Sequence, residues 1–292
     1  MRYIAPDAPI QSFQGTYIDV MLAFLRDPEV IVLALGESPY VSGESANMAN
    51  IELPEEQKVL IEKAKRTGKK LVGVVMSGRP LALETVEPYL DAIVWAWQNG
   101  TEGAAAAAAV LYGDVNPSGK LSMTLPRVIG QIPLYYNQTT SCRQNEGYYS
   151  DEPIRNYRDT LGSPLYPFGY GLSYTTFKYD NVKLSSANLK KEDVLTVTFD
   201  LENTGKYEGT EVAQLYVQDK FASVTRPVKE LKRFARVTLK PGEKKNVSFE
   251  LPISELAFWN IDMVKTVEAG DFALWVAPDS QSGEEVFFKV VD

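Results

Sequence analysis

The spacing of apolar residues changes about half-way along this chain of 292 residues. Between residues 30 and 113, runs of consecutive apolar residues alternate with helical patterns, and such runs are typical of strands buried on both faces of a parallel sheet. From residue 178 onward, apolar and polar residues alternate, as they do in strands with one buried face. The two patterns predict an α/β domain with a mainly parallel sheet, followed by an all-β domain.

The first domain is predicted to repeat a strand and a helix three times. Pro54 is suited to the start of a helix, and Gly68 and Gly113 to the residues that end one. The predicted strands are residues 30–35, 71–76 and 91–97, and the predicted helices are residues 54–68, 81–90 and 101–112.

The second domain is predicted to be a β-sandwich of about 100 residues, because short strands recur at the spacing that this architecture requires. Turn-forming residues such as those at 203–205 and 240–242 separate the strands. The predicted strands are residues 194–202, 211–218, 247–251, 272–277 and 286–291.

A segment rich in glycine and aromatic residues, 167–177, lies between the two patterns. Gly169 and Gly171 allow aromatic rings to pack closely on the main chain, so this segment predicts a tight join rather than a flexible linker. We expect an α/β domain over residues 1–135, of which 1–29 are atypical, an ordered connecting segment over 136–177, and the β-sandwich over 178–292.

Composition limits the chemistry that the chain can perform. There is no histidine, which excludes histidine-dependent triads and histidine-ligated metal sites and leaves proton transfer mainly to carboxylates. A formal net charge of −8 disfavours nucleic acid or an anionic membrane as a partner and is compatible with a neutral sugar. The single Cys142 cannot form an internal disulfide. Residues 1–30 lack a signal-peptide pattern, and no segment has the roughly 18 apolar residues of a membrane span.

Polar residues gather where the predicted parallel strands end, and ligands of such sheets bind beyond the carboxyl ends of the strands. Glu37 and Glu44 follow the first strand, Arg79 follows the second, and Trp97 ends the third. The segment 36–53 is long for a strand-to-helix loop, which favours a functional role.

Each of these residues also has a structural interpretation that the sequence leaves open. Taken alone, Glu44 suits a solvated loop acid or a backbone cap, and Glu37 suits a carboxylate that binds backbone amides. Arg79 suits an internal salt bridge, and Trp97 suits either the core or a platform for a sugar ring.

Several short motifs follow one another in a fixed order: residues 77–83 (SGRPLAL), 116–121 (NPSGKL), 164–177 (PLYPFGYGLSYTTF), 226–232 (RPVKELK) and 239–243 (LKPGE). Together they are similar to those of family 3 glycoside hydrolases, most closely the bacterial β-glucosidases. The resemblance runs from about residue 30 to the end. It implies the later part of the family's α/β sandwich domain and a complete fibronectin type III-like domain over residues 178–292.

The resemblance implies a retaining mechanism, in which an aspartate on a (β/α)8 barrel is the nucleophile and a glutamate of the α/β sandwich domain is the acid/base. Glu44 matches the acid/base position, with Glu37 as the competing assignment. Glu37, Arg79 and Trp97 are the predicted substrate-binding residues. Relatives use no organic cofactor, no metal site is predicted, and members of the family are often periplasmic or secreted.

Two departures from the family pattern limit what the chain can do alone. Asn47 and Met48 stand where bacterial relatives have a Ser-Arg pair, and no barrel precedes residue 30. We predict the C-terminal portion of a β-glucosidase-like enzyme that acts on a β-glucoside or oligosaccharide and depends on a barrel-containing chain or self-association. The alternative is a non-catalytic carbohydrate-binding or scaffolding protein, so the sequence leaves open whether this chain is an enzyme.

Overall fold

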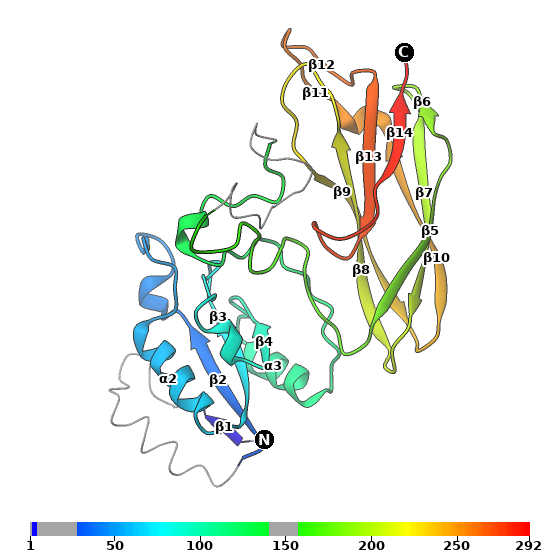
Figure 1. The fold of residues 1–292 in the computed structure, drawn as a ribbon. Coiled ribbons are helices and arrows are strands. Elements are labelled where there is room, and N and C mark those ends of the chain that lie inside the picture. The colour runs from blue at the N-terminus through cyan, green and yellow to red at the C-terminus, as the bar shows by residue number, and fades with distance from the viewer. Residues whose placement is uncertain (1, 5–27, 140–156) are drawn as a thin grey trace. The chain divides into compact units, whose positions relative to one another are not determined.

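The chain forms two compact units (Figure 1). The computed structural model describes residues 2–4, 28–139 and 157–292, so Cys142 and part of the predicted connecting segment 136–177 lie outside the described residues. The chain passes between the units three times. The first unit comprises Met1–Val115 and Leu125–Pro133, and the second comprises Asn116–Thr124 and Leu134–Asp292.

The first unit contains one parallel sheet in the order β1-β2-β3-β4. Its three longer strands were predicted, whereas β1, which has three residues, was not. The strands are β1 (Arg2–Ile4), β2 (Val30–Gly36), β3 (Lys70–Met76) and β4 (Ala92–Trp95). The helices are α2 (Glu55–Lys65), α3 (Gly103–Tyr112) and the short 3-10 helices η2 (Pro39–Val41), η3 (Glu87–Tyr89) and η4 (Ile129–Gln131).

Helix α2 begins within one residue of the predicted start and ends at Lys65, three residues before the predicted end at Gly68. Pro54 precedes its first turn, which carries two glutamates, and Lys63 and Lys65 lie in its last turn, so the charges complement the helix dipole. The predicted helix at 81–90 is wrong, because only η3 forms there. Leu81 and Leu83 are fully buried and Ala82 forms a bridge to Glu52, so this apolar segment packs in extended form.

The second unit is a β-sandwich, which confirms the predicted class of an α/β domain followed by an all-β domain. Strand β7 alternates as predicted, with Leu195, Val197, Phe199 and Leu201 all buried in the core between the sheets. One sheet has the order β10-β7-β5, the other the order β6-β14-β13-β8-β9, and β11 pairs with β12. The strands are β5 (Phe177–Leu184), β6 (Asn188–Leu189), β7 (Val194–Asn203), β8 (Gly209–Asp219), β9 (Glu230–Leu239), β10 (Lys244–Pro252), β11 (Phe258–Trp259), β12 (Lys265–Thr266), β13 (Gly270–Ala277) and β14 (Val286–Val290).

The glycine-rich aromatic segment packs tightly, as predicted, and lies within the second unit. Gly169 has a φ of 81°, and a side chain there would collide with Gln214. The backbone of Gly169 donates to Leu121, while Leu121 donates to Tyr170. Residues 116–124, which the sequence places in the first domain, therefore pack with the second unit.

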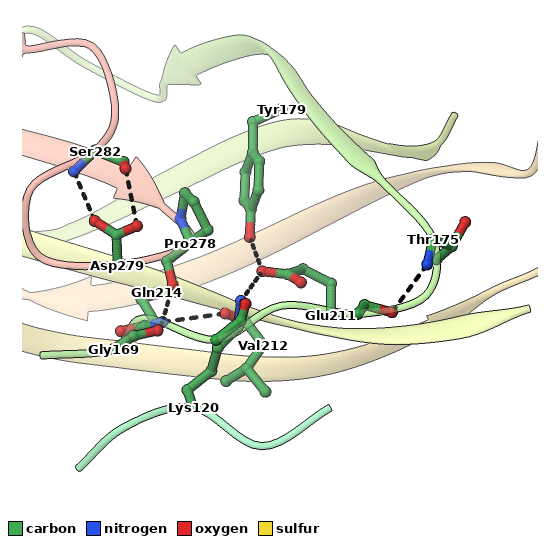
Figure 2. Close-up of polar contacts among 12 residues, drawn as sticks. Lys120, Gly169, Thr175, Tyr179, Glu211, Val212, Gln214, Pro278, Asp279 and Ser282 are labelled. Carbon is green, nitrogen blue, oxygen red and sulfur yellow. Dashed lines mark hydrogen bonds and ion pairs between the residues drawn. The ribbon is translucent and has the colours of Figure 1, made fainter. Parts of the chain in front are cut away.

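A buried ion pair links these segments to the β-sandwich (Figure 2). The Lys120 Nζ lies 3.0 Å from the Glu211 Oε1, and the two side chains are 11% and 5% exposed. Lys120 also donates to the carbonyl of Gly171 at 2.9 Å, and the hydroxyl of Tyr179 donates to Glu211 at 2.9 Å. Burial raises the pKa of the Tyr179 hydroxyl, so it remains a donor at neutral pH.

A second buried carboxyl, Asp219, ends strand β8 with 9% of its surface exposed. Burial raises the pKa of Asp219 to about 6. Arg226 and the backbone amide of Phe221 favour the charged form, whereas the charges of Glu268 and Glu230 oppose it. Asp219 therefore carries an electrostatic cost when it is ionised.

We expect Lys120→Met to lower the free energy of unfolding by about 3 kcal/mol, because it leaves Glu211 buried without its counter-ion. Urea unfolding followed by circular dichroism measures this loss. Lys178→Met is the matched control, since Lys178 pairs with Asp180 on the surface and its loss should cost less than about 1 kcal/mol. Equal losses in the two variants would contradict a special role for the buried pair.

We expect Asp219→Asn to stabilise the chain above pH 6. The pKa is raised on folding, so the stability contributed by protonated Asp219 is present below about pH 4 and lost as the pH rises to about 6. At pH 7.5 the variant should gain about 1–3 kcal/mol over the parent chain, and the gain should shrink towards pH 4. Thermal unfolding across this range checks it, with Asp271→Asn as an exposed control. A gain that does not vary with pH would contradict it.

Candidate active site

The carboxyl ends of β2, β3 and β4 lie along one edge of the parallel sheet. Gly36 is the register partner of Met76, and Val75 is the partner of Trp95. The backbone amide of Glu37 donates to Met76, and that of Ala96 donates to Val75, so pairing continues to the start of each loop. The three loops that the sequence singles out thus leave the sheet at neighbouring points.

Gln57 of helix α2 fixes the end of strand β2. Its buried side-chain amide accepts from the backbone amide of Gly36 and donates to the carbonyl of Gly36, both at 2.8 Å. Gly36 has a φ of 128°, and a side chain there would collide with the carbonyl of Met76. Glu37 therefore leaves the strand in a defined direction. A polar residue on the buried face of a helix is the only signal in the sequence that points to Gln57.

Glu37 is buried and already has two partners. Its side chain is 6% exposed, accepts from the Ser77 hydroxyl at 2.8 Å, and lies 3.2 Å from the Arg79 Nε. The Ser77 hydroxyl oxygen also accepts from the backbone amide of Arg79 at 3.1 Å. Ser77, which was not among the predicted site residues, joins the loops after β2 and β3.

Arg79 binds the loop that carries Glu44. Its Nη2 donates to the carbonyl of Val41 at 2.7 Å and to the carbonyl of Ala46 at 3.0 Å. The side chain is 20% exposed. Arg79 therefore contacts Glu37 through one nitrogen and both sides of the Glu44 segment through another.

Glu44 lies in a tight turn and is exposed to solvent. The backbone amide of Ala46 donates to the carbonyl of Gly43 at 3.2 Å, which closes the turn. Ser45 has a φ of 61°, a left-handed conformation that a serine adopts only at some cost. The turn presents Glu44 outward, whereas Glu37 is directed to internal partners.

The loop after β4 approaches the same turn. Gln98 donates to the Ser42 hydroxyl at 3.2 Å. A side chain at Gly78 would come within 2.8 Å of both the Gln98 amide nitrogen and the Ser42 hydroxyl oxygen, so glycine allows the three loops to meet. Gln98 and Ser42 were not identified from the sequence.

Trp97 packs edge-on against Trp95, with their ring centroids 5.6 Å apart. Trp97 has a φ of 51°, which is unusual for a large side chain and typical of positions that the surrounding structure constrains. Both rings are half-buried. The position of Trp97 is compatible with both roles that the sequence left open, core packing and a platform for a ring.

This arrangement suits proton transfer by one exposed carboxylate held in a fixed turn. Within the described residues, no group of three or more histidine, cysteine, aspartate or glutamate side chains is placed to bind a metal ion. Across the same part of the chain, no helix has the length and apolar character that a membrane crossing requires.

Two family models match this chain. The model of the glycosyl hydrolase family 3 C-terminal domain matches residues 8–174, and that of the fibronectin type III-like domain matches residues 211–280. The chain belongs to glycoside hydrolase family 3. Because the match begins at residue 8, the family resemblance starts earlier than the predicted residue 30.

Relatives in family 3 include enzymes of known activity. The chain is 44% identical to the periplasmic β-glucosidase of Salmonella typhimurium over 94% of this chain and 36% of that enzyme. It is 38% identical to a β-xylosidase of Formosa agariphila over 96% of this chain and 38% of the relative. The structure of a Listeria innocua β-glucosidase with bound glucose matches with a TM-score of 0.88 and 36% identity, over 96% of this chain and 39% of that one.

The chain therefore spans less than two-fifths of the length of these family 3 relatives and matches their C-terminal portion. The described residues form one four-stranded parallel sheet and a β-sandwich, with no (β/α)8 barrel among them. The assignment of Glu44 as acid/base, and of Glu37, Arg79 and Trp97 as substrate-binding residues, stays a prediction.

We expect Gly36→Ala to destabilise the chain by more than about 3 kcal/mol, because the added methyl group would strain the backbone and collide with Met76. Urea unfolding followed by tryptophan fluorescence measures the effect. Gly130→Ala is the control, since a side chain at Gly130 would meet no atom within 4 Å and should change stability by about 0.5 kcal/mol or less. Similar stabilities for the two variants would contradict the close approach at Gly36.

Proposed function

We propose that this chain supplies the acid/base glutamate, Glu44, and the adjoining loops of a retaining β-glucosidase, whose nucleophile comes from a barrel that the described residues do not contain. The observation that carries the proposal is the fixed, solvent-facing turn on which Glu44 lies, in a chain of family 3. A β-glucoside or short β-linked oligosaccharide is the proposed substrate.

The proposed reaction has two steps, and Glu44 acts in both. Glu44 first donates a proton to the glycosidic oxygen as the nucleophilic carboxylate attacks the anomeric carbon. It then removes a proton from the water that hydrolyses the glycosyl-enzyme intermediate. The two carboxyl groups of a retaining enzyme lie about 5–5.5 Å apart, which a solvent-facing group on a loop can satisfy when a barrel packs beside it.

Glu44 is a better candidate than Glu37 for this role. An acid/base residue must reach the glycosidic oxygen and exchange its proton with substrate and water. Glu37 is 6% exposed, and its contacts with Arg79 and Ser77 would be lost or weakened on protonation. Glu44 is exposed, so its carboxyl group is accessible to substrate and water.

Sugar binding is proposed for Trp97, whose ring lies at the end of β4 beside Trp95. Aromatic rings at strand ends offer an apolar face to a pyranose ring. Structures of the Listeria innocua β-glucosidase hold glucose and laminaribiose, which supports a β-linked glucose unit as the ligand of the completed site here.

The proposal predicts that the full chain will give an active enzyme when fused to the part of the Salmonella typhimurium β-glucosidase that precedes its matched region. Glu44→Ala should then lower kcat for 2,4-dinitrophenyl β-glucoside by about 100-fold or more. Added azide should raise the kcat of the Glu44→Ala fusion at least about tenfold. Azide attacks the glycosyl-enzyme without needing a general base and gives β-glucosyl azide as the product. Product analysis by nuclear magnetic resonance identifies the azide and its configuration.

Two controls sharpen this test. Glu102→Ala removes another carboxylate of the same three loops, at the start of α3, and should leave kcat unchanged. Glu37→Gln should not respond to azide. A fusion whose activity survives Glu44→Ala would overturn the proposal. A folded fusion that binds glucose but turns over no substrate would favour a carbohydrate-binding function instead.

A further inference from the structure

We propose that Arg79 is the positioning residue for Glu44 and that Glu37 is the counter-ion of Arg79 rather than a sugar ligand. The inference deepens the proposed function and depends on it. It differs from the sequence prediction, which placed Arg79 and Glu37 among the substrate-binding residues.

One guanidinium nitrogen closes the segment that carries Glu44. The carbonyls of Val41 and Ala46, which lie on either side of residues 42–45, both accept from the Arg79 Nη2. The turn therefore cannot open without breaking at least one of these hydrogen bonds. Because Glu44 lies between the two anchored residues, Arg79 fixes the main chain from which the Glu44 side chain extends.

The carboxylate of Glu37 holds the guanidinium in place. The Arg79 Nε lies 3.2 Å from Glu37, whose other contact is the Ser77 hydroxyl at 2.8 Å. A largely buried arginine requires a charged partner, and the Glu37 side chain, which is 6% exposed, provides it from a position with little access for a substrate hydroxyl. Glu37 is in turn fixed to the sheet, because its amide donates to Met76.

Lysine could not replace arginine in this arrangement. Arg79 uses the Nε towards a carboxylate and the Nη2 towards two carbonyls, which requires the fixed planar geometry of a guanidinium. A lysine ammonium is a single point that could satisfy either the carboxylate or the carbonyls. Arg79→Lys therefore keeps the charge and removes the positioning function.

The test compares two substrates in the active fusion described above. Leaving-group protonation limits hydrolysis of methyl β-glucoside far more than that of 2,4-dinitrophenyl β-glucoside, so a misplaced acid should affect the first substrate selectively. We expect Arg79→Lys to lower kcat/KM by about 30-fold or more for the methyl glucoside and by about threefold or less for the dinitrophenyl glucoside. Arg127→Lys, which alters an arginine paired with Glu84 in the same unit, is the matched control and should change neither value.

A second measurement uses the full 292-residue chain alone. Backbone amides of residues 42–47 should exchange hydrogen at least about tenfold faster in Arg79→Lys than in the parent chain, with exchange in the strands unchanged. If circular dichroism shows that Arg79→Lys loses secondary structure, the Glu37→Gln variant is measured instead. The same selective loss of kcat/KM for the methyl glucoside is then expected.

The outcomes separate this inference from the proposed function. If Arg79→Lys lowers kcat/KM equally for both substrates, or for neither, the positioning role is overturned. Glu44→Gln, measured in parallel, should show the larger selective loss on the methyl glucoside. If Glu44→Gln shows no such selectivity, the proposed function itself fails. If Glu44→Gln shows it and Arg79→Lys does not, only the positioning role fails.

Discussion

An ion pair that is largely removed from water, between Glu37 and Arg79, organises the loops at the carboxyl ends of β2 and β3. It joins the loop after β2 to the loop after β3, and the Nη2 of the guanidinium anchors the turn that carries Glu44. Gln57 and Gly36 connect this pair to helix α2 and the sheet edge. A buried pair of this kind gives little net stability, but loss of either partner leaves an uncompensated charge, so it specifies one arrangement of the loops.

The second unit also contains a buried ion pair, which holds a chain segment rather than a loop of the candidate site. Lys120 and Glu211 form a buried pair that binds residues 116–124 to the β-sandwich, and Tyr179 completes the hydrogen bonding of the carboxylate. Gly171 lets the aromatic segment lie against Gly119 and Lys120, and Gly169 lets it lie against Gln214 and Tyr216. Two motifs that precede the β-sandwich in sequence are therefore part of its packing, which explains why the compact units do not follow the order of the chain.

The chain belongs to family 3 but matches only part of its relatives, which limits the function that can be proposed for it alone. The chain spans 36% of the Salmonella enzyme and 39% of the Listeria structure, and the described residues contain the loop of the proposed acid/base residue, Glu44, without a barrel. Retaining hydrolysis requires two carboxylates at a short separation. The proposed activity is therefore a property of this chain together with a barrel, and the fixed turn around Glu44 is what this chain contributes.

Sequence alone determined the fold class, the three longer strands of the parallel sheet, and the strands of the β-sandwich with clear alternation, because burial on two faces or one leaves a direct pattern in apolar spacing. It did not predict β1, β6, β11 and β12, which are very short, or β5 and β9, whose residues are mostly half-buried or exposed. It also placed a helix at 81–90, where residues 81–83 are extended and only η3 is helical. Glu44, Glu37, Arg79 and Trp97 were all predicted to lie near one edge. Only the tertiary structure separated an exposed Glu44 from a buried Glu37 and showed where the Arg79 donors bind, because the partners of a charged side chain come from loops far apart in sequence.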